Sequence, residues 1–416
     1  MKFGYAKQLN FAMQGINSYI IIISACLLVI VSYLYNILSQ KTGIPAVLML
    51  LITGIGVREY LIYKKAAIAI PPQIVELFGI LGLIMIVLEA GLDLKISAGK
   101  IKTIRNAFFS ALIILVISAA ACSGLLFYFL QDNYLHCLIY AIPLSIVSSA
   151  IVIPSISHMN ETTKEFLVYE TSFSDILGIL LFNYIIAGNI LKAGNIAFFL
   201  GSILVGLALS IALSVLILFI LTRITTRVRF FLIFAVLIFL YAGGKMLHLP
   251  SLFIILLFGL LVANWKSTFF SKLYKWIPAT KVTDVGQLLH SLSVESSFLI
   301  RTFFFFIFGL TINLHLLVDA EVIVAGSALV VTLFLIRMMY LRFFLHSHIL
   351  PELFFMPRGL ITILLFYSIP TVYKLSEFNE GILFFVILVT STIMMAGSIL
   401  YGRPKLETIN EETPLT

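Results

Sequence analysis

Apolar runs of about 20 residues follow one another along almost the whole chain of 416 residues. A run of this length crosses the hydrocarbon core of a bilayer as a helix, because in lipid a helix satisfies its own backbone hydrogen bonds. Hydrophobic residues make up 61% of the chain and charged residues 11%, against about 25% charged residues in an ordinary soluble domain. The pattern excludes a soluble globule and predicts an all-α polytopic membrane protein.

Thirteen membrane spans are predicted with a hydropathy window of about 19 residues. The spans cover roughly residues 18–38, 44–63, 74–92, 105–130, 135–157, 166–190, 196–221, 228–247, 250–264, 292–313, 321–345, 353–373 and 378–402. This count divides the chain into an N-terminal segment outside the cytoplasm (1–17), a transmembrane domain (18–402) and a short cytoplasmic tail (403–416).

The basic residues of the loops indicate how the spans are oriented. With thirteen spans the two termini lie on opposite sides, and the loops on the side of the C-terminus hold sixteen Lys and Arg residues against seven on the other side. Because cytoplasmic loops carry the excess of Lys and Arg, we expect a multi-pass protein of the inner (cytoplasmic) membrane with its C-terminus in the cytoplasm. The net charge of +8 then reflects topology, and no nucleic-acid partner is expected because no basic run alternates with aromatic side chains.

The seventh span separates two groups of six, so the second group is inverted relative to the first. Inverted repeats are a recurrent transporter architecture, in which discontinuous helices meet near the bilayer midplane. Helix breakers and hydroxyl residues interrupt the fifth and twelfth spans, which hold corresponding places in the two groups. They are Ser145, Ser148, Ser149, Pro154 and Ser155 in the fifth span, and Pro357, Gly359, Thr362 and Pro370 in the twelfth. Two inverted repeats with crossed discontinuous helices at spans five and twelve are therefore predicted.

Asp175 is the most informative charged residue, because it lies near the middle of the sixth span. A carboxylate at that depth costs several kcal/mol, so a function is the default expectation; a structural hydrogen bond to a neighbouring helix is the alternative. Hydroxyl residues beside it could coordinate a dehydrated cation. Glu170 lies five residues earlier, about 140° around the helix, so it is expected to pair with a buried cation instead of sharing the ion.

Two arginines are candidate partners for Glu170. Arg337 lies deep in the eleventh span, and Arg301 lies in the tenth span before four consecutive phenylalanines. For both, the alternative is that the long side chain reaches out to the cytoplasmic surface. Glu89 and Asp93 end the third span, where pairing with the basic loop that follows is the simpler interpretation.

Motifs of other function classes are missing from the sequence. It contains no phosphate-binding loop, no Gly-x-Ser-x-Gly elbow and no His-Glu-x-x-His pattern. The histidines lie at span ends or in loops without convincing metal-ligand spacing. Neither an enzyme, a cofactor nor a resident metal is expected, and the energy for transport would come from an ion gradient.

Several short motifs, in the same order and spacing, resemble the cation:proton antiporter superfamily, which includes the sodium/hydrogen exchangers and their potassium-linked relatives. The motifs are residues 42–45 with Gly54 in the second span, 88–92 in the third, 148–152 in the fifth, 170–175 in the sixth, 305–310 in the tenth, Arg337 in the eleventh and 357–360, which include Arg358, in the twelfth. Two positions depart from the exchangers. Ser174 replaces the Asn that precedes the essential Asp, and Ser149 and Ala150 replace an Asp-Pro pair in the fifth span.

The resemblance implies that Asp175 binds the cation and the proton in turn, and that Glu170 and Arg337 form a structural ion pair beside it. It also implies a homodimer in which a moving core (about 74–190 and 292–402) works against a scaffold (about 18–63 and 196–264). Glu89, Arg301 and Arg358 are further candidates for the site. The fifth span is similar to the potassium-efflux branch and the sixth to the exchanger branch, so K⁺/H⁺ exchange stays open beside Na⁺/H⁺ exchange. A gated cation channel or sensor on the same fold is the third possibility.

The expected mechanism is competition at one carboxylate. If Asp175 holds either a proton or a cation (Na⁺, with Li⁺ or K⁺ as alternatives), exchange is obligatory. Because Ser174 carries no titratable proton, the exchange is expected to be one for one and electroneutral. The hydroxyls expected to replace part of the hydration shell are those of Thr171, Ser174, Ser148 and Ser149.

Overall fold

A computed structural model gives the fold of the chain. It describes residues 18–64, 72–94, 98–156, 159–186, 201, 204, 208, 211–220, 229–246, 251–265, 279–345, 349–375 and 377–401. In these residues all regular secondary structure is helical. The helices of the first half are α2 (Ser18–Thr42), α3 (Ala46–Tyr63), α4 (Pro72–Asp93), η1 (Ala98–Lys100), α5 (Ile101–Leu130), α6 (Tyr134–Ser145), α7 (Ser149–Ser155) and α8 (Glu161–Ile186). Those of the second half are α10 (Arg229–Met246), α11 (Ser251–Ala263), α12 (Ala279–Thr311), α13 (Leu314–Leu317), α14 (Ala320–Tyr340), η3 (Leu341–Leu345), η4 (Glu352–Phe354), α15 (Leu360–Tyr367), η5 (Thr371–Tyr373) and α16 (Glu380–Tyr401).

The helices follow the predicted spans in order, and the all-α membrane class is confirmed. Within the described residues, seven helices are long and apolar enough to cross a bilayer, and shorter apolar helices cover 211–220, 232–244 and 254–263. The seventh predicted span is described only in part, so the count of thirteen stays a prediction. The predicted terminal segments, 1–17 and 403–416, lie outside the described residues.

The tenth span begins earlier than predicted. The sequence predicts that the tenth span starts at residue 292, because charged and hydroxyl side chains precede it, but α12 already starts at Ala279. Val282, Val285 and Leu289 are buried, at spacings of three and four residues. This is the period of a helix with one apolar face, and polar residues on the other face lowered the mean hydropathy below that of a span.

Spans five and twelve are discontinuous, as predicted. α6 ends at Ser145 and α7 begins at Ser149, with residues 146–148 between them. In span twelve, residues 355–359 separate the short turn η4 from α15. Pro143 and Pro357 lack a backbone N–H and so weaken the helical hydrogen-bond ladder near each break.

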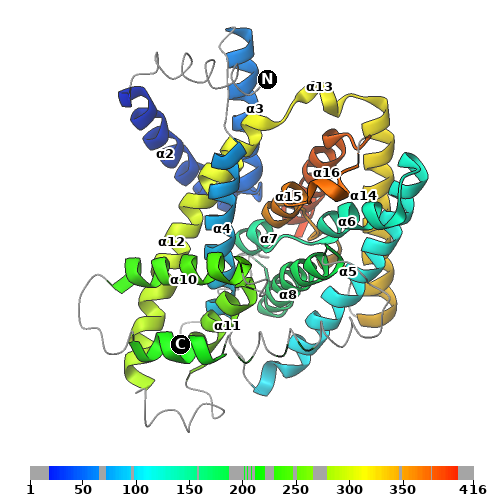
Figure 1. Cartoon of the computed structure of the whole chain (residues 1–416). Helices are drawn as coiled ribbons and strands as arrows, with labels where there is room; N and C mark the ends of the chain where they lie inside the picture. The colour runs from blue at the N-terminus through cyan, green and yellow to red at the C-terminus, as the bar shows by residue number, and fades with distance from the viewer. Residues whose placement is uncertain are drawn as a thin grey trace, which may run out of the picture.

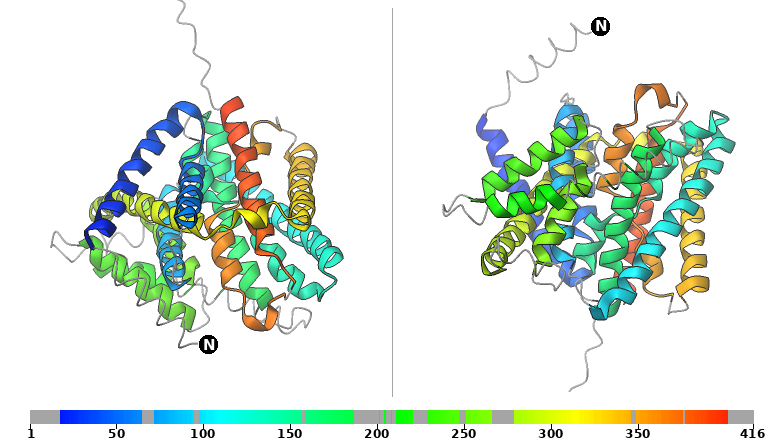
Figure 2. Two further views of the ribbon diagram at one scale, coloured as in Figure 1. Left: turned by 90° about the horizontal axis from the view of Figure 1, so that it is seen from above. Right: turned by 60° about the horizontal axis from the view of Figure 1, so that its bottom comes forward.

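The described helices form two groups that are visible side by side in Figure 1. α3, α4, α11 and α12 pack chiefly on one another, with α2 and α10 beside them. α5, α6, α8, α14 and α16 form the second group, and the half-helices α7 and α15 lie inside it. The two further views in Figure 2 show the same division. The predicted core, 74–190 and 292–402, thus includes two helices, α4 and α12, that pack mainly in the other group.

Two glycine crossings hold the first group together and reflect the inverted repeat. Gly54 of α3 meets Gly309 of α12 so closely that a Cβ on either would clash with backbone of the other helix. Gly91 of α4 and Gly259 of α11 make the matching crossing, where a Cβ on Gly91 would lie 2.6 Å from the Leu256 carbonyl oxygen. Span two crosses span ten in the first pair, and span nine crosses span three in the second. Exchanging the two repeats converts one crossing into the other.

Candidate functional site

In the broken segment of span five, the backbone N–H of Ile146 still donates to the Pro143 carbonyl of α6, but those of the next residues find acceptors in other parts of the chain. Val147 N–H donates to Ser174 Oγ at 3.0 Å, and Ser148 N–H donates to the Pro357 carbonyl at 2.9 Å. Ser149 N–H donates to Asp175 Oδ2 at 3.3 Å. A buried N–H without a partner is costly, so α8 and the break in span twelve together fix the path of this segment.

Arg358 lies in the break of span twelve and is 1% exposed. Its guanidinium donates to the carbonyls of Leu144, at 2.7 Å, and Met356, and its backbone N–H donates to Thr390 Oγ1 at 3.1 Å. The cation therefore lies at the C-terminal end of α6, where free carbonyls concentrate partial negative charge. Among the described residues no carboxylate pairs with Arg358.

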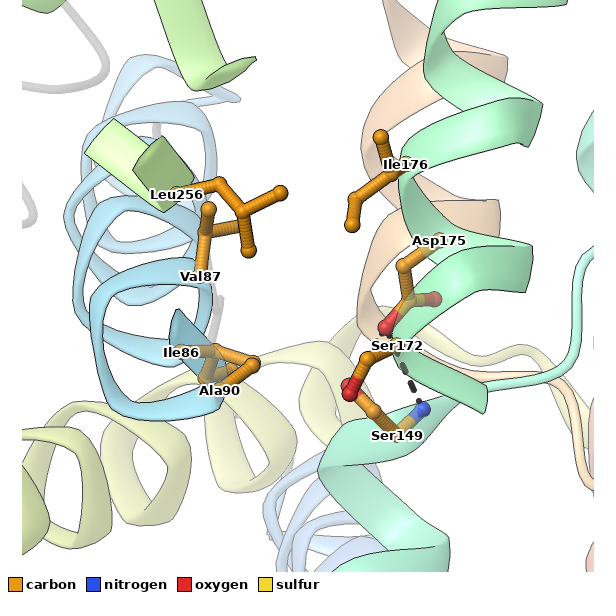
Figure 3. A pocket seen from close by; sticks show the side chains of 8 residues that line it. All are labelled: Ile86, Val87, Ala90, Ser149, Ser172, Asp175, Ile176 and Leu256. Carbon is orange, nitrogen blue, oxygen red and sulfur yellow. Dashed lines mark hydrogen bonds between the residues drawn. The ribbon is translucent and has the colours of Figure 1, made fainter. Parts of the chain in front are cut away.

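Asp175 is 4% exposed and faces a small cavity between the two groups of helices. Ser149 donates both its N–H and its hydroxyl to Oδ2, whereas Oδ1 is buried without a hydrogen-bond partner. Figure 3 shows side chains of α7 and α8 on one side of the cavity and side chains of α4 and α11 on the other, with the Asp175 carboxylate directed towards Ser149. The lining residues are Ile86, Val87 and Ala90 of α4, Leu256 of α11, Ser149 of α7, and Ser172, Asp175 and Ile176 of α8. One carboxylate in an otherwise largely apolar cavity can hold a proton or a cation.

The other predicted hydroxyls lie near Asp175 but have different contacts. Thr171 donates to the Leu167 carbonyl of its own helix at 2.8 Å. Ser174 accepts the Val147 N–H, and the backbone of Ser148 bonds to Pro357. Of the four hydroxyl residues expected from the sequence, Ser149 is the one that contacts the Asp175 carboxylate.

Ser172 lines the cavity although the sequence reasoning did not select it. It precedes Asp175 by three residues, and residues three apart share a face of a helix. That spacing was readable in the sequence. Several hydroxyl residues flank Asp175, and the family motif includes Thr171 and Ser174 as well, so the sequence alone did not single out Ser172.

Glu170 and Arg337 form a buried pair beside the site. Arg337 Nη2 lies 2.7 Å from Glu170 Oε2 and Nη1 lies 3.2 Å from Oε1, and both side chains are 1% exposed. Ser110 of α5 donates to Glu170 Oε1 at 2.6 Å, and Arg337 Nε donates to the Glu352 carbonyl at 3.0 Å. The group ties α5, α8 and α14 to the turn η4 that leads into span twelve.

Glu89 and Arg301 lie together at the interface of α4 and α12. Arg301 Nη1 is 3.6 Å from Glu89 Oε2, to which Ser297 also donates. One turn further along α4, Asp93 lies 2.8 Å from His290 Nε2. These contacts are with α12 and correct the interpretation that Glu89 and Asp93 pair with the basic loop, because the early start of α12 brings its polar first half against the end of α4.

Metal-binding clusters are not found in the part of the chain that the structure describes, where no three His, Cys, Asp or Glu side chains come together. Of the span-end histidines, His248, His346 and His348 lie outside that part.

Crossed broken helices with a buried carboxylate between them are the architecture of ion-coupled secondary transporters. The family model described as the transmembrane part of sodium/hydrogen exchangers matches residues 26–400, and the chain belongs to this family. No curated protein sequence matches the chain.

Two solved structures of the sodium proton antiporter MjNhaP1 from Methanocaldococcus jannaschii share the fold. The structure at pH 8 is 20% identical, with a TM-score of 0.65, over 92% of this chain and 97% of the other. The second, from electron microscopy, is 19% identical, with a TM-score of 0.66, over 96% of this chain and 100% of the other.

Proposed function

We propose that the chain exchanges Na⁺ for H⁺ across the cell membrane by competition at Asp175. The observation that carries the proposal is the buried carboxylate of Asp175, a residue that lines a cavity between the two groups of helices and whose Oδ1 has no hydrogen-bond partner. Family membership and the fold of MjNhaP1, a sodium proton antiporter, support Na⁺ and H⁺ as the exchanged ions.

Competition follows from the size and composition of the site. The cavity has room for about one water-sized particle, and Asp175 is the carboxylate that lines it. A proton on Asp175 removes the negative charge that a cation needs, and a bound cation disfavours the proton. Each crossing then carries one or the other, which is obligate exchange.

The remaining site residues position this carboxylate. Ser149 donates its hydroxyl to Asp175 Oδ2 and so orients the carboxylate. The hydrogen bonds of Ser174 Oγ and of the Ser148 N–H fix the backbone just before Ser149. Thr171 stabilises the turn of α8 before Asp175. Arg358 neutralises the partial negative charge of the carbonyl groups at the end of α6. Glu170 and Arg337 join the helices around the site without facing the cavity.

The transport motion is proposed to occur at the cavity, where the two groups of helices meet. Because α4 and α12 pack with α3 and α11, we assign α4 and α12 to the scaffold and not to the moving core. α5 to α8 and α14 to α16 would shift against the scaffold, which would also form the homodimer. The C-terminus would face the cytoplasm.

Exchange in proteoliposomes tests the function directly. Purified protein is reconstituted with a pH-sensitive dye inside the vesicles, and Na⁺, Li⁺ or K⁺ is added outside. We expect Na⁺ to drive proton efflux from wild-type vesicles and none from Asp175→Asn vesicles, with both proteins folded and inserted. Efflux driven by K⁺ alone would replace the Na⁺ proposal with K⁺/H⁺ exchange. Cation flux without proton movement would indicate a channel.

A further inference from the structure

Two residues that line the same cavity each carry a buried oxygen atom without a hydrogen-bond partner. One is Asp175 Oδ1, and the other is the hydroxyl oxygen of Ser172, whose residue is 2% exposed. Both side chains come from one face of α8, three residues apart, and both lie on the cavity side of the helix (Figure 3). Burying polar atoms without partners costs free energy, so their convergence on one cavity indicates a ligand.

A structural role does not account for the Ser172 hydroxyl. A serine or threonine within a helix commonly donates to the carbonyl four residues earlier, as Thr171 does to Leu167 and Thr390 does to Val386. Ser172 makes no such bond. Ser118 of α5 is also buried without a partner, but it does not line the cavity. The combination of an unpaired hydroxyl with the cavity distinguishes Ser172.

We infer that Ser172 is a direct ligand of the transported cation, and that this site selects small monovalent cations, Na⁺ and Li⁺, over K⁺. The inference rests on the proposed exchange at Asp175. A hydroxyl offers lone pairs to a cation, so Ser172 Oγ and the Asp175 carboxylate supply oxygen ligands from one face of α8. Ser149 donates its N–H and its hydroxyl to Oδ2, so it orients the carboxylate without neutralising its charge.

The rest of the cavity explains the size selection. Ile86, Val87, Leu256 and Ile176 present aliphatic carbon to the ion, so they cannot replace its hydration shell. The space left is about that of one water molecule. A small cation suits this volume, whereas K⁺ needs a larger cavity and more ligands. Cavity size and ligand number are the usual determinants of such selectivity.

The test compares Ser172→Ala with Ser118→Ala, which removes an equally buried and unpaired serine hydroxyl elsewhere in the same group of helices. Removing one ligand of a charged group is expected to raise the apparent KM for Na⁺ and Li⁺ by about tenfold or more in Ser172→Ala. The maximal rate should change much less, and Ser118→Ala should keep the wild-type KM. Ser172→Cys, which nearly preserves the volume but offers a poor ligand for hard cations, should follow Ser172→Ala.

A second readout does not depend on transport. Ligand binding to the folded state raises thermal stability, so NaCl should raise the melting temperature of detergent-solubilised wild type above that in choline chloride. Ser172→Ala and Ser172→Cys should lose this increase at the same NaCl concentration while melting normally in choline chloride.

The outcomes separate this inference from the proposed function. A wild type that fails to exchange Na⁺ for H⁺ overturns both. A wild type that exchanges Na⁺, with folded Ser172→Ala or Ser172→Cys showing wild-type KM and stabilisation, overturns the ligand role of Ser172 alone. Exchange of K⁺ with a KM equal to that of Na⁺ overturns the size selection.

Discussion

Arg337 donates to both carboxylate oxygens of Glu170, and the two side chains lie buried where α8, α14 and the turn η4 at the start of span twelve meet. The pair is connected further, because Ser110 donates to Glu170 and Arg337 donates to the Glu352 carbonyl. It therefore joins helices of both inverted repeats, and on α8 it lies five residues before Asp175. Its expected role is to hold that arrangement, since neither side chain faces the cavity.

Breaking this pair should reduce stability more than it changes ion affinity. Glu170→Gln and Arg337→Met each leave one buried charge without its partner, which costs about 3–5 kcal/mol. The double variant should recover part of the loss, but not all, because the Glu352 carbonyl still lacks the donor that Arg337 supplied. Melting temperatures of the four proteins in detergent measure the coupling. Strictly additive losses would contradict direct pairing.

Alanine at the glycine crossings should destabilise the first group of helices. A Cβ on Gly91 would lie 2.6 Å from the Leu256 carbonyl oxygen and one on Gly259 would lie 2.8 Å from the Leu88 carbonyl oxygen, so the helices must separate at a cost of about 1–3 kcal/mol. Gly54→Ala and Gly309→Ala should have the same effect.

Gly56→Ala is the matched control for Gly54→Ala, because it adds the same methyl group to α3 where no atom lies within 4 Å. It should melt at or slightly above the wild-type temperature, since alanine favours a helix. Equal melting temperatures for Gly54→Ala and Gly56→Ala would show that the close crossing does not limit stability.

Arg358→Met should lower both stability and exchange. It leaves the Leu144 and Met356 carbonyls without their donor, at about 1–3 kcal/mol for each buried unsatisfied group, and it removes the positive charge from the end of α6. Arg358→Lys keeps the charge but cannot reproduce the guanidinium geometry, so it should retain more exchange than Arg358→Met. Equal exchange rates for wild type and Arg358→Met would exclude a role for this charge.

Lower pH should weaken Na⁺ binding without changing the maximal rate. Because a proton and Na⁺ exclude one another at Asp175, each reduces the affinity for the other. When the protonated form dominates, the apparent KM for Na⁺ should rise by about tenfold for each unit decrease in pH, the limit for one competing proton. Rates measured over a grid of pH and Na⁺ concentration give this slope. A steeper dependence would indicate a second titrating group.

The sequence predicted those parts of the fold that the bilayer and helix chemistry determine. Long apolar runs located the spans, and Pro357 and Gly359 marked the break in span twelve. The sequence could not show that α4 and α12 pack with α3 and α11, because lipid-facing and protein-facing sides of such helices are equally apolar. The sequence also did not predict the start of α12. Only a narrow apolar face of that segment is buried, and its polar side chains lower the mean hydropathy.

At the site, the sequence identified Asp175 as the central candidate but did not distinguish the hydroxyls around it. Thr171, Ser172 and Ser174 lie within four residues of Asp175, and rotation by about 100° per residue points them in different directions. Which of them faces a cavity depends on how α8 is turned against α4 and α7. Only the packed structure sets that angle.

Exchange should be electroneutral, one Na⁺ for one H⁺. Asp175 is the carboxylate that lines the cavity, and its neighbour Ser174 has no proton to contribute. Glu89 is directed to Ser297 and Arg301 on α12, and Glu170 is paired with Arg337. The Na⁺-loaded site with ionised Asp175 and the proton-loaded site with neutral Asp175 then carry the same net charge.

Na⁺/H⁺ exchange should accordingly be independent of a membrane potential imposed with K⁺ and valinomycin. Ser174→Asp, which places a second acid beside Asp175, should introduce voltage dependence if the protein folds, and Ser174→Asn is its uncharged control. A wild-type rate that varies with the imposed potential would mean that a second carboxylate titrates during the cycle. Glu89→Gln would then identify the group, because removing Glu89 should restore voltage independence if Glu89 is that carboxylate.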